Sequence, residues 1–459
     1  MLRTIVVIGG GFSGTVLVAR LLQVPPAGLT RLVLVERDGR PGRGVAYASR
    51  HHPYILNVPA GRMSASAADP LQFLRYAQRR RPSCAAEDFV PRAWYGEYLE
   101  ELLRAAQLQA PQRIRLEVIE GAAVGVRRVD RASPLVVQID HGAEIVADQV
   151  VLATGNPPPA HLPATRPLAR HERYVHDPWA GPLGFRAGER LLLIGTGLTA
   201  LDVALAAAAA GNRPSIVHCL SRRGLIPPRQ TAFRPDAFRG DGESVLLGAA
   251  PSLRRIVRAV RILAEEAERA GGDWREAITF VRNLAPTLWQ RLPESERRRF
   301  LRHVRVYWDV HRHRLPESTL EQVGKLRQSG WLQIHGGRIE RIVPGEGTLS
   351  VHWKARGSGE PRLLEVDRVV NCTGPDYAPG RSSDPLIRGL LRDGLAVADA
   401  LGLGLRTGPN GALVDADGWP GPHLYYLGPM LRADHWETTA ALELRGHAER
   451  LAAHLAARS

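Results

Sequence analysis

Two short apolar runs, the first β-branched and the second leucine-rich, each lead directly into a glycine-rich turn and then into a helical pattern. The first run covers residues 4–8, and its turn, GGGFSG, leads into an Ala/Leu/Val-rich segment at 15–22. Far downstream, the run at 191–194 leads into GTGLTA and a second such segment at 201–210. Short apolar runs bounded by glycine indicate buried strands, and the segments behind them predict helices. The chain therefore predicts the unit strand–turn–helix twice.

Each turn has the spacing of small residues that a dinucleotide-binding turn needs. The first glycine permits a tight bend, the second lets backbone amides approach a pyrophosphate, and the third lets helix and strand pack closely. A strand before the motif and a helix after it distinguish this turn from an unrelated glycine-rich loop. The second turn has Ala200 at its third small position, an accepted variant. The predicted cofactor-binding residues are Gly9, Gly11, Phe12, Ser13 and Gly14 in the first turn, and Gly195, Gly197, Leu198 and Thr199 in the second.

The residue at the same offset after each turn differs in charge. Glu36 follows the first turn, with Arg37 beside it, and Arg222 follows the second, with Arg223 beside it. An acid at this place suits a ribose with free hydroxyls, whereas an arginine suits a 2′-phosphate. We therefore expect one plain adenosine dinucleotide and one phosphorylated dinucleotide, a pattern typical of a flavoprotein that binds FAD and is reduced by NADPH.

A second internal repeat supports this arrangement. Residues 148–155 match residues 367–374 at Asp, Val-Val and Thr-Gly. Each copy predicts a buried strand that returns the chain toward its own nucleotide. Thr154, Gly155 and Gly374 are therefore further predicted cofactor-binding residues.

The order of these elements predicts an α/β fold with two Rossmann-like dinucleotide-binding domains and a helical insertion. We expect residues 1–180 to form the first part of the FAD-binding domain and residues 362–459 its second part. Residues 181–361 are expected to form the NADPH-binding domain. Within it, strand patterns disappear at about 227–330, and helices are predicted at 252–270, 273–284 and 293–303. This insertion either caps the active site or serves plain packing or a contact between copies of the chain. A homo-oligomer is therefore one of the alternatives.

Composition limits the classes of function. The 459 residues carry a formal net charge of +15, but only Lys325 and Lys354 are lysines, and the arginines are scattered. No zinc-finger spacing, aromatic RNA-binding motif or recognition helix is present, so we expect no nucleic acid, and a small acidic substrate fits better. No apolar run approaches the ~20 residues of a membrane helix. The first strand begins at once, which leaves no room for a signal peptide. We expect a cytoplasmic protein without a membrane contact.

The three cysteines exclude one kind of flavoenzyme. Cys84, Cys219 and Cys372 form neither a Cys-x-x-Cys nor a Cys-x4-Cys pair. A dithiol therefore cannot pass electrons from a flavin to a disulfide. No spacing of metal ligands stands out either, and no metal is predicted.

Several longer motifs resemble a bacterial family of FAD/NAD(P)-binding flavoproteins. They lie at residues 44–47 (GVAY), 56–64 (LNVPAGRMS), 69–74 (DPLQFL), 176–179 (HDPW) and 436–440 (WETTA). The wider relatives of that family are the class B flavin monooxygenases, which include amine N-hydroxylases and Baeyer–Villiger enzymes. The resemblance implies FAD, NADPH and a two-domain fold, and adds Tyr47 and Met63 to the expected cofactor residues. It does not give the substrate.

Two of these motifs also have a physical interpretation. Asn57 and Val58 offer an amide and backbone groups to the polar edge of a flavin, although an asparagine before proline is also an ordinary turn. Gly428 follows a predicted strand at 424–427, and a helix is expected to begin near Thr438 and Thr439. Its amides would suit the N1/O2 edge of a flavin, and the same residue types also cap ordinary helices.

The densest polar cluster of the insertion is Tyr307-Trp308-Asp309 followed by His311-Arg312-His313-Arg314. Arginine there would bind a carboxylate-bearing substrate or the NADPH phosphate through a bidentate contact. Adjacency in sequence does not show that these side chains face one way. Asn57 and Arg312 are the only candidates for a catalytic role, and the sequence assigns no other catalytic residue.

We expect an NADPH-dependent FAD monooxygenase that uses molecular oxygen to oxidise a small amino acid or amine at nitrogen. The cofactors carry this chemistry, so no catalytic triad is required. The alternative is an NADPH-dependent flavin dehydrogenase or reductase without oxygen insertion. A redox sensor or scaffold that only holds FAD is a third hypothesis, for which a complete NADPH site would be unnecessary.

Overall fold

The computed structural model describes residues 2–48, 52–128, 130, 133–231, 241–248 and 250–458. Its chain divides into two compact units, each of which contains one of the predicted turns. The first unit consists of Met1–Pro157, Arg282–Glu294 and Tyr377–Ser459, and the second of Pro158–Val281 and Ser295–Asp376.

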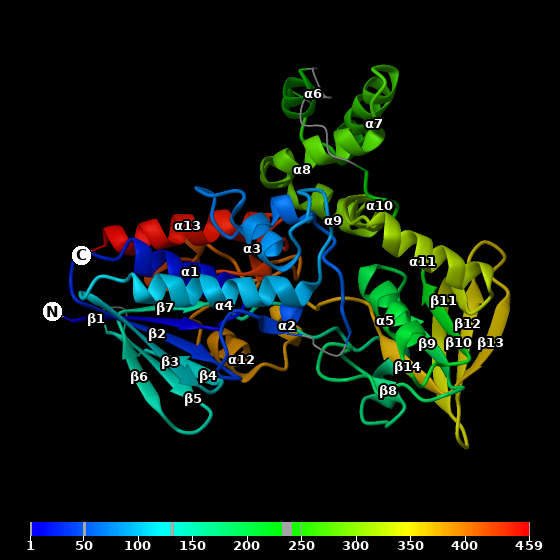
Figure 1. The fold of residues 1–459 in the computed structure, drawn as a ribbon, viewed down its shortest axis with the longest axis horizontal. Helices are drawn as coiled ribbons and strands as arrows, with labels where there is room; N and C mark the ends of the chain where they lie inside the picture. Colours follow the sequence, from blue (N-terminus) through cyan, green and yellow to red (C-terminus); the bar gives the residue numbers. More distant parts are fainter. Residues whose placement is uncertain are drawn as a thin grey trace. The chain divides into compact units, whose positions relative to one another are not determined.

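The first unit is built on a six-stranded sheet of order β15-β16-β7-β1-β2-β3. All neighbours in it are parallel except β15, which runs antiparallel to β16. Helices α1, α4 and α13 pack on one face of it (Figure 1). The strands are β1 (Arg3–Ile8), β2 (Thr30–Glu36), β3 (Ile114–Glu120), β7 (Gln149–Leu152), β15 (Ala412–Val414) and β16 (Pro420–Tyr426), and the three helices are α1 (Phe12–Gln23), α4 (Arg92–Leu108) and α13 (Ala441–Ala457).

The two faces of this sheet have separate cores because successive side chains of a strand point to opposite sides. Ile5 and Val7 of β1 face the three helices, whereas Val6 and Ile8 face a small antiparallel sheet and helix α12. All four side chains are buried. The small sheet consists of β4 (Ala123–Arg127), β5 (Leu135–Ile139) and β6 (Glu144–Ala147), α12 covers Pro385–Arg392, and the short helices α2 (Gly44–Tyr47) and α3 (Gln72–Arg80) precede α4.

The second unit repeats the plan on a seven-stranded sheet of order β13-β12-β11-β10-β9-β14-β8. Helices α5 and α11 pack on one of its faces, and a second core lies on the other. The strands are β8 (Tyr174–Val175), β9 (Arg190–Ile194), β10 (Ile216–Ser221), β11 (Leu332–Pro344), β12 (Leu349–Ala355), β13 (Pro361–Val366) and β14 (Arg368–Asn371), and the two helices are α5 (Leu198–Ala209) and α11 (Glu317–Gln328).

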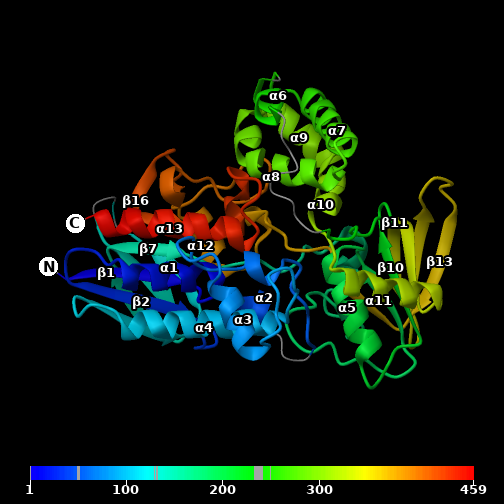
Figure 2. The same ribbon diagram turned by 45° about the horizontal axis from the view of Figure 1, so that its top comes forward.

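The elements that the structure describes between β10 and α11 are all helices, as predicted. Figure 2 shows α6, α7 and α9 gathered into one helical group. The amide of Leu253, the first residue of α7, donates to Glu296 of α9 at 2.7 Å. The helices are α6 (Gly242–Gly248), α7 (Leu253–Arg269), α8 (Trp274–Arg291), α9 (Glu294–His303) and α10 (Arg305–Arg312).

The limits of the compact units differ from the predicted domains in three places. The first division falls at 157/158 rather than 180/181, because β8 pairs with β14 in the second sheet. The second falls at 376/377 rather than 361/362, because β14 pairs with β9. Residues 282–294, expected in the NADPH-binding domain, belong to the first unit. Long-range strand pairing and packing decide these limits, and a linear pattern does not reveal them.

Candidate functional site

The first glycine-rich turn is close-packed at two of its glycines. Gly9 has a φ of 104°, and a Cβ there would lie 2.4 Å from the Ala153 carbonyl oxygen. A Cβ on Gly14 would lie 1.9 Å from the Gly9 carbonyl oxygen, so α1 approaches β1 as only glycine permits. Gly11 is the N-cap of α1, and no side chain in the described part of the chain caps this helix. The first amides of α1 therefore stay available for an anion such as a pyrophosphate.

Glu36, the last residue of β2, lies against this turn. Its Oε2 accepts a hydrogen bond from the Gly10 amide at 2.5 Å. Arg37 follows it and is exposed. The carboxylate is thus at the place where an acid reaches the hydroxyls of a bound ribose.

The carboxyl ends of β7 and β16 lie next to each other beside β1, because β7 pairs with both strands. Thr154 and Gly155 follow β7, and Gly428 follows β16. The Tyr426 hydroxyl is in hydrogen-bonding contact with Thr154. A Cβ on Gly428 would lie 2.7 Å from the same hydroxyl. In open α/β sheets ligands bind outside the carboxyl ends of the strands, which is where the structure brings these predicted residues together.

The loop at 54–64 is held in place by its backbone. The amides of Leu56, Ala60 and Gly61 donate to carbonyl oxygens of segment 86–90 at 2.8–2.9 Å. A Cβ on Gly61 would lie 2.8 Å from the Ala86 Cβ, so glycine is required for this approach. These hydrogen bonds and this close contact hold the loop in one conformation against segment 86–90.

The predicted flavin contacts of this loop have different environments. Asn57 is half-buried, and its amide has no hydrogen-bond partner among the described residues. Val58 packs at the edge of the helical-side core, and Met63 is buried in it. An unpaired, half-buried amide fits a ligand with polar edges, and the flavin contact of Asn57 stays a prediction.

A cluster of aromatic rings lies behind the first turn. The Phe12 ring, at the start of α1, lies 6.1 Å from the Tyr95 ring, and the Tyr47 ring lies 4.7 Å from it. Ser13, the next residue of α1, is buried. Burial raises the pKa of Tyr47 to about 12 and that of Tyr95 well above its ordinary value. These phenols are therefore neutral hydrogen-bond donors at any physiological pH.

The C-terminal segment differs from the prediction. Helix α13 begins at Ala441, and its N-cap is Ala440, so the helix expected near Thr438 and Thr439 starts later. Thr438 is buried, and its hydroxyl donates to the His435 carbonyl oxygen at 2.7 Å, while Thr439 is half-buried. Thr438 therefore stabilises the turn that precedes the helix and does not cap it.

The second turn repeats the geometry of the first. Gly195 has a φ of 129°, and a Cβ there would lie 2.6 Å from the Cys372 carbonyl oxygen. Gly197 is the N-cap of α5 and has open space around it, and no side chain of the described ranges caps this helix. Leu198 and Thr199 begin α5, and both are half-buried. The open amides again fit a pyrophosphate.

The two arginines predicted to bind a 2′-phosphate stand at the end of β10. Arg222 is exposed, and the guanidinium of Arg223 lies 4.8 Å from the centre of the Tyr307 ring. The hydroxyl of Thr196, in the second turn, lies 2.9 Å from the hydroxyl of Ser221, the last residue of β10. Gly374 follows β14 with a φ of 85° and open space around it. The turn, the arginines and the Thr-Gly strand of the second unit thus meet at one edge of its sheet.

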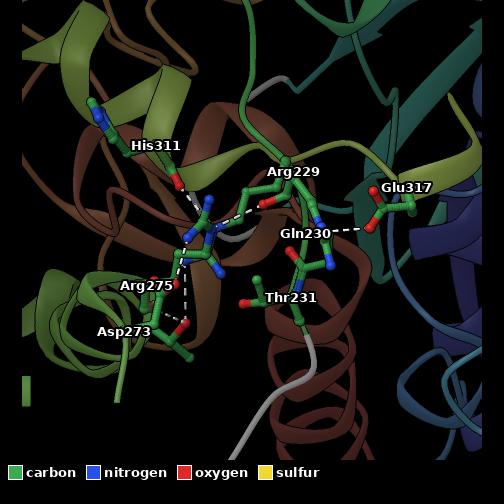
Figure 3. Close-up of polar contacts among 9 residues, drawn as sticks. Arg229, Gln230, Thr231, Asp273, Arg275, His311 and Glu317 are labelled. Carbon is green, nitrogen blue, oxygen red and sulfur yellow. Dashed lines mark hydrogen bonds and ion pairs between the residues drawn. The ribbon is translucent and has the colours of Figure 1, made fainter. Parts of the chain in front are cut away.

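The cluster at 311–314 is partly occupied by structural contacts (Figure 3). Arg314 is buried and donates to the His311 and Arg275 carbonyl oxygens at 3.0 and 3.1 Å. Arg275 donates in turn to the Arg229 carbonyl oxygen at 3.0 Å. The side chains of this cluster thus do not all face one way. Arg314 joins the end of α10 to the start of α8, and Arg275 joins the start of α8 to the segment that follows β10. Arg312, at the end of α10, stays the candidate for substrate.

Two of the cysteine thiols are held in their neutral form. Burial raises the pKa of Cys219 to about 12 and that of Cys372 well above its ordinary value. Cys84 is buried as well, and all three are free. Because only a thiolate is nucleophilic, burial makes the thiols of Cys219 and Cys372 poor nucleophiles.

The described residues contain neither a membrane-spanning helix nor a cluster of metal ligands. No helix among them is long and apolar enough to cross a membrane. No group of three or more His, Cys, Asp or Glu side chains among them is arranged to hold a metal ion.

Comparison with known proteins agrees with this geometry. Residues 6–157 match the model of a family described as FAD-NAD(P)-binding. A search of curated proteins found no match. The predicted dinucleotide-binding domain of the first unit is therefore confirmed.

Solved structures with the same fold cover nearly the whole chain. An L-lysine 6-monooxygenase from Pseudomonas syringae has a TM-score of 0.66 at 16% identity, and an ornithine hydroxylase from Pseudomonas aeruginosa has 0.65 at 14%, each over 99% of both chains. A cadaverine monooxygenase from Erwinia amylovora, solved with FAD bound, has 0.65 at 13% over 100% of this chain and 95% of its own. These likenesses confirm the predicted fold class of two Rossmann-like domains.

Some residues of the site were not predicted. Thr196 and Ser221 form a hydroxyl pair behind the second turn, and the Tyr95 hydroxyl is buried near the first. Segment 282–294 packs in the first unit, against residues that follow Gly428. Hydroxyl residues and a tryptophan in a helix have no motif of their own, so only the fold reveals their place.

Proposed function

We propose that the protein is an FAD- and NADPH-dependent monooxygenase that oxidises a small amino acid or amine at nitrogen. The observation that carries the proposal is the pair of uncapped glycine-rich turns, one beside Glu36 and the other beside Arg222 and Arg223. The match of residues 6–157 to an FAD-NAD(P)-binding family supports the first cofactor. The structural neighbours include an ornithine hydroxylase, a lysine monooxygenase and a cadaverine monooxygenase, which supports the substrate class.

In this proposal the first unit holds FAD and the second holds NADPH. The amides of α1 bind the FAD pyrophosphate, and Glu36 binds the adenosine ribose. Asn57, Gly155 and Gly428 surround the flavin ring. In the second unit the amides of α5 bind the pyrophosphate of NADPH, and Arg222 and Arg223 bind its 2′-phosphate.

When bound, the flavin accepts hydride from NADPH and activates molecular oxygen. The chain contributes orientation and the exclusion of water. The fixed loop at 54–64, the half-buried Tyr47 and the buried Tyr95 give a flavin an apolar wall on one side. A dry wall favours oxygen transfer over the loss of peroxide.

The substrate is proposed to be a small amine, with or without a carboxylate. Arg312, at the end of α10, is the residue of this chain that we assign to a substrate carboxylate, because a guanidinium binds a carboxylate through two parallel hydrogen bonds. An amine without a carboxylate would not need this arginine. Replacing Arg312 with methionine should therefore raise the KM for ornithine or lysine and leave that for cadaverine little changed.

The alternative is an NADPH-dependent flavin reductase or dehydrogenase that inserts no oxygen. One experiment separates the two functions. Purified protein is supplied with FAD, NADPH and oxygen, and L-ornithine, L-lysine and cadaverine are tested in turn. The proposal expects one hydroxylated product for each NADPH consumed, identified by mass. NADPH oxidation that yields peroxide alone with every amine would establish the alternative.

A further inference from the structure

The helical insertion contributes a segment that packs in the first unit beside the flavin-side turns. Residues 282–294, the second part of α8 and the turn after it, belong to that unit. They pack against Pro429–Ala433 and the residues that follow, which connect β16 to α13. This contact has no role yet in the proposed function.

Trp289 makes the central contact. Its side chain is 3% exposed, and its Nε1 donates to the Ala433 carbonyl oxygen at 2.9 Å. Its ring lies 4.8 Å from the ring of Trp436, which is also buried. One side chain of the insertion therefore fixes both a backbone carbonyl and a ring of the C-terminal segment.

Arg282, near the middle of the same helix, makes a second contact. It forms an ion pair with Glu443, in the first turn of α13, and its Nε lies 4.0 Å from Glu437 Oε2. The Glu437 side chain is 6% exposed and that of Arg282 is 16% exposed. A buried carboxylate needs a cation or donors nearby, and Arg282 places a cation beside both side chains.

The contacts continue from Trp436 to the end of β7. The guanidinium of Arg432 lies 4.3 Å from the centre of the Trp436 ring and 5.0 Å from that of Tyr377. The Tyr377 hydroxyl donates to the Asn156 side chain at 2.8 Å, and Asn156 directly follows Gly155. A continuous set of packed side chains therefore connects α8 with the turn assigned to the flavin.

We propose that Trp289 and Arg282 are positioning residues of the flavin site: they hold the segment 432–439 in the place that the flavin requires. Segment 282–294 of the insertion is then part of the flavin site. This inference rests on the assignment of FAD to the first unit. It adds to that assignment two residues from a segment that the sequence places in the other domain.

The test compares two tryptophans in the same protein. Trp289→Phe removes the indole donor and keeps an aromatic ring. Trp331→Phe is the matched control, because Trp331 is also buried and donates its Nε1 to a backbone carbonyl, that of Pro214 at 2.8 Å, in the second unit. For each variant, the dissociation constant of FAD, the flavin midpoint potential and the visible circular dichroism of the bound flavin are measured.

We expect Trp289→Phe to weaken FAD binding about tenfold and to change the flavin circular dichroism, because the Ala433 carbonyl loses its buried donor. Trp331→Phe should leave both at wild-type values. Arg282→Met should weaken FAD binding by more than tenfold, and Arg282→Lys should recover part of the loss because it keeps the charge. Hydrogen exchange at 429–440 should rise in the Trp289 and Arg282 variants alone.

The outcomes are distinguishable. If the wild-type protein binds no FAD, the proposed function fails and this inference with it. If the wild type binds FAD but the Trp289 and Trp331 variants match each other in affinity, potential and circular dichroism, the function stands and the positioning role is refuted. A Trp289 variant that loses FAD yet shows no added exchange at 429–440 also contradicts the role, because the segment would then not depend on α8.

Discussion

The two dinucleotide-binding units share a backbone and differ in a few side chains around each turn. In both, an aspartate before the Thr-Gly strand accepts a hydrogen bond from the strand that leads to the turn. Asp148 accepts from the Thr4 amide and Asp367 from the Arg190 amide, each at 2.7 Å. In both, the first glycine lies too close to a carbonyl of the Thr-Gly copy for any side chain.

The differences concern the residue after the first glycine and the residue at the end of the second strand. In the first unit Gly10 donates its amide to Glu36, and the acid lies against the turn. In the second unit Thr196 stands in place of Gly10 and bonds to Ser221, and Arg222 remains exposed. The same backbone thus places a glutamate beside the turn in one unit and an exposed arginine in the other. A change of charge at one edge is sufficient to change the preferred ligand.

The largest effect should come from the third small position of each turn. Gly14→Ala places a Cβ 1.9 Å from the Gly9 carbonyl oxygen, so α1 must move and the protein should lose FAD binding. Ala200→Gly at the equivalent place of the second unit should cost only about 0.5–1 kcal/mol of helix stability. The flavin content of the purified variants and their melting temperatures check both. A Gly14→Ala protein that retains stoichiometric FAD would show that the first turn is not the FAD site.

The second effect concerns the choice of nicotinamide cofactor. Replacing Arg222 and Arg223 with alanine removes a charge-assisted contact to the phosphate worth about 1.5–3 kcal/mol in total, so the NADPH requirement should rise roughly 10- to 150-fold. The rate with NADH should change little. Rates of anaerobic flavin reduction over a range of both nucleotides give the answer. Equal use of NADPH and NADH by the unmodified protein would contradict the assignment of the second unit.

Removing the charge of Glu36 tests the same comparison in the first unit. Glu36→Gln keeps the size of the side chain but removes the charge that faces the Gly10 amide. We expect FAD binding to weaken about tenfold, since a hydrogen bond to a charged group is lost or reduced. Isothermal titration of the apoprotein with FAD measures it, and NADPH binding serves as the internal control. Weakened NADPH binding with unchanged FAD would reverse the assignment of the two units.

Acid should destabilise the second unit through a pair of histidines in its sheet. His218 on β10 and His335 on β11 are neighbours, with 3.0 Å between His218 Nδ1 and His335 Nε2. Burial lowers the pKa of His218 to about 4 and also lowers that of His335. The folded protein thus favours neutral rings, so stability is fully present above the unfolded pKa of about 6.5 and is lost as the pH falls toward 4.

Hydrogen exchange of β10 and β11 between pH 7 and pH 4.5 checks this loss. His218→Leu should flatten the pH dependence there, and the strands of the first sheet serve as the reference. A loss of the order of 1 kcal/mol would lower the melting temperature of a domain of this size by about 2–4 °C. An unchanged slope in His218→Leu would refute the role of this pair.

The smallest effect should come from Cys372. It stands where the first unit has Ala153, and its carbonyl rather than its thiol approaches the turn. Cys372→Ala should therefore leave NADPH use unchanged and cost about 1 kcal/mol through the lost buried sulfur. Steady-state kinetics and a melting curve check it. A large loss of activity would show that the thiol takes part in the reaction.

The sequence by itself determined the two strand–turn–helix units and the residues that make them. Glycine spacing, an apolar strand before it and a helix after it are local features, because a tight turn and a close helix–strand contact exclude side chains at fixed positions. Glu36, Arg222 and the Asp…Thr-Gly repeat were predicted for the same reason. The structure brings Glu36, Arg222 and the two Thr-Gly pairs to the carboxyl edge of their sheets, and it places the two aspartates at the amino ends of the strands.

Only the tertiary structure decided which chain segments complete each unit. The limits at 157 and 376 follow from the pairing of β8 and β14 in the second sheet. The start of α13 at Ala441 follows from the turn that His435 and Thr438 form, which a helix-favouring sequence does not reveal. The place of Trp289 against Ala433 depends on a contact between residues 144 positions apart. Such contacts arise from packing in three dimensions and leave no periodic signal along the chain.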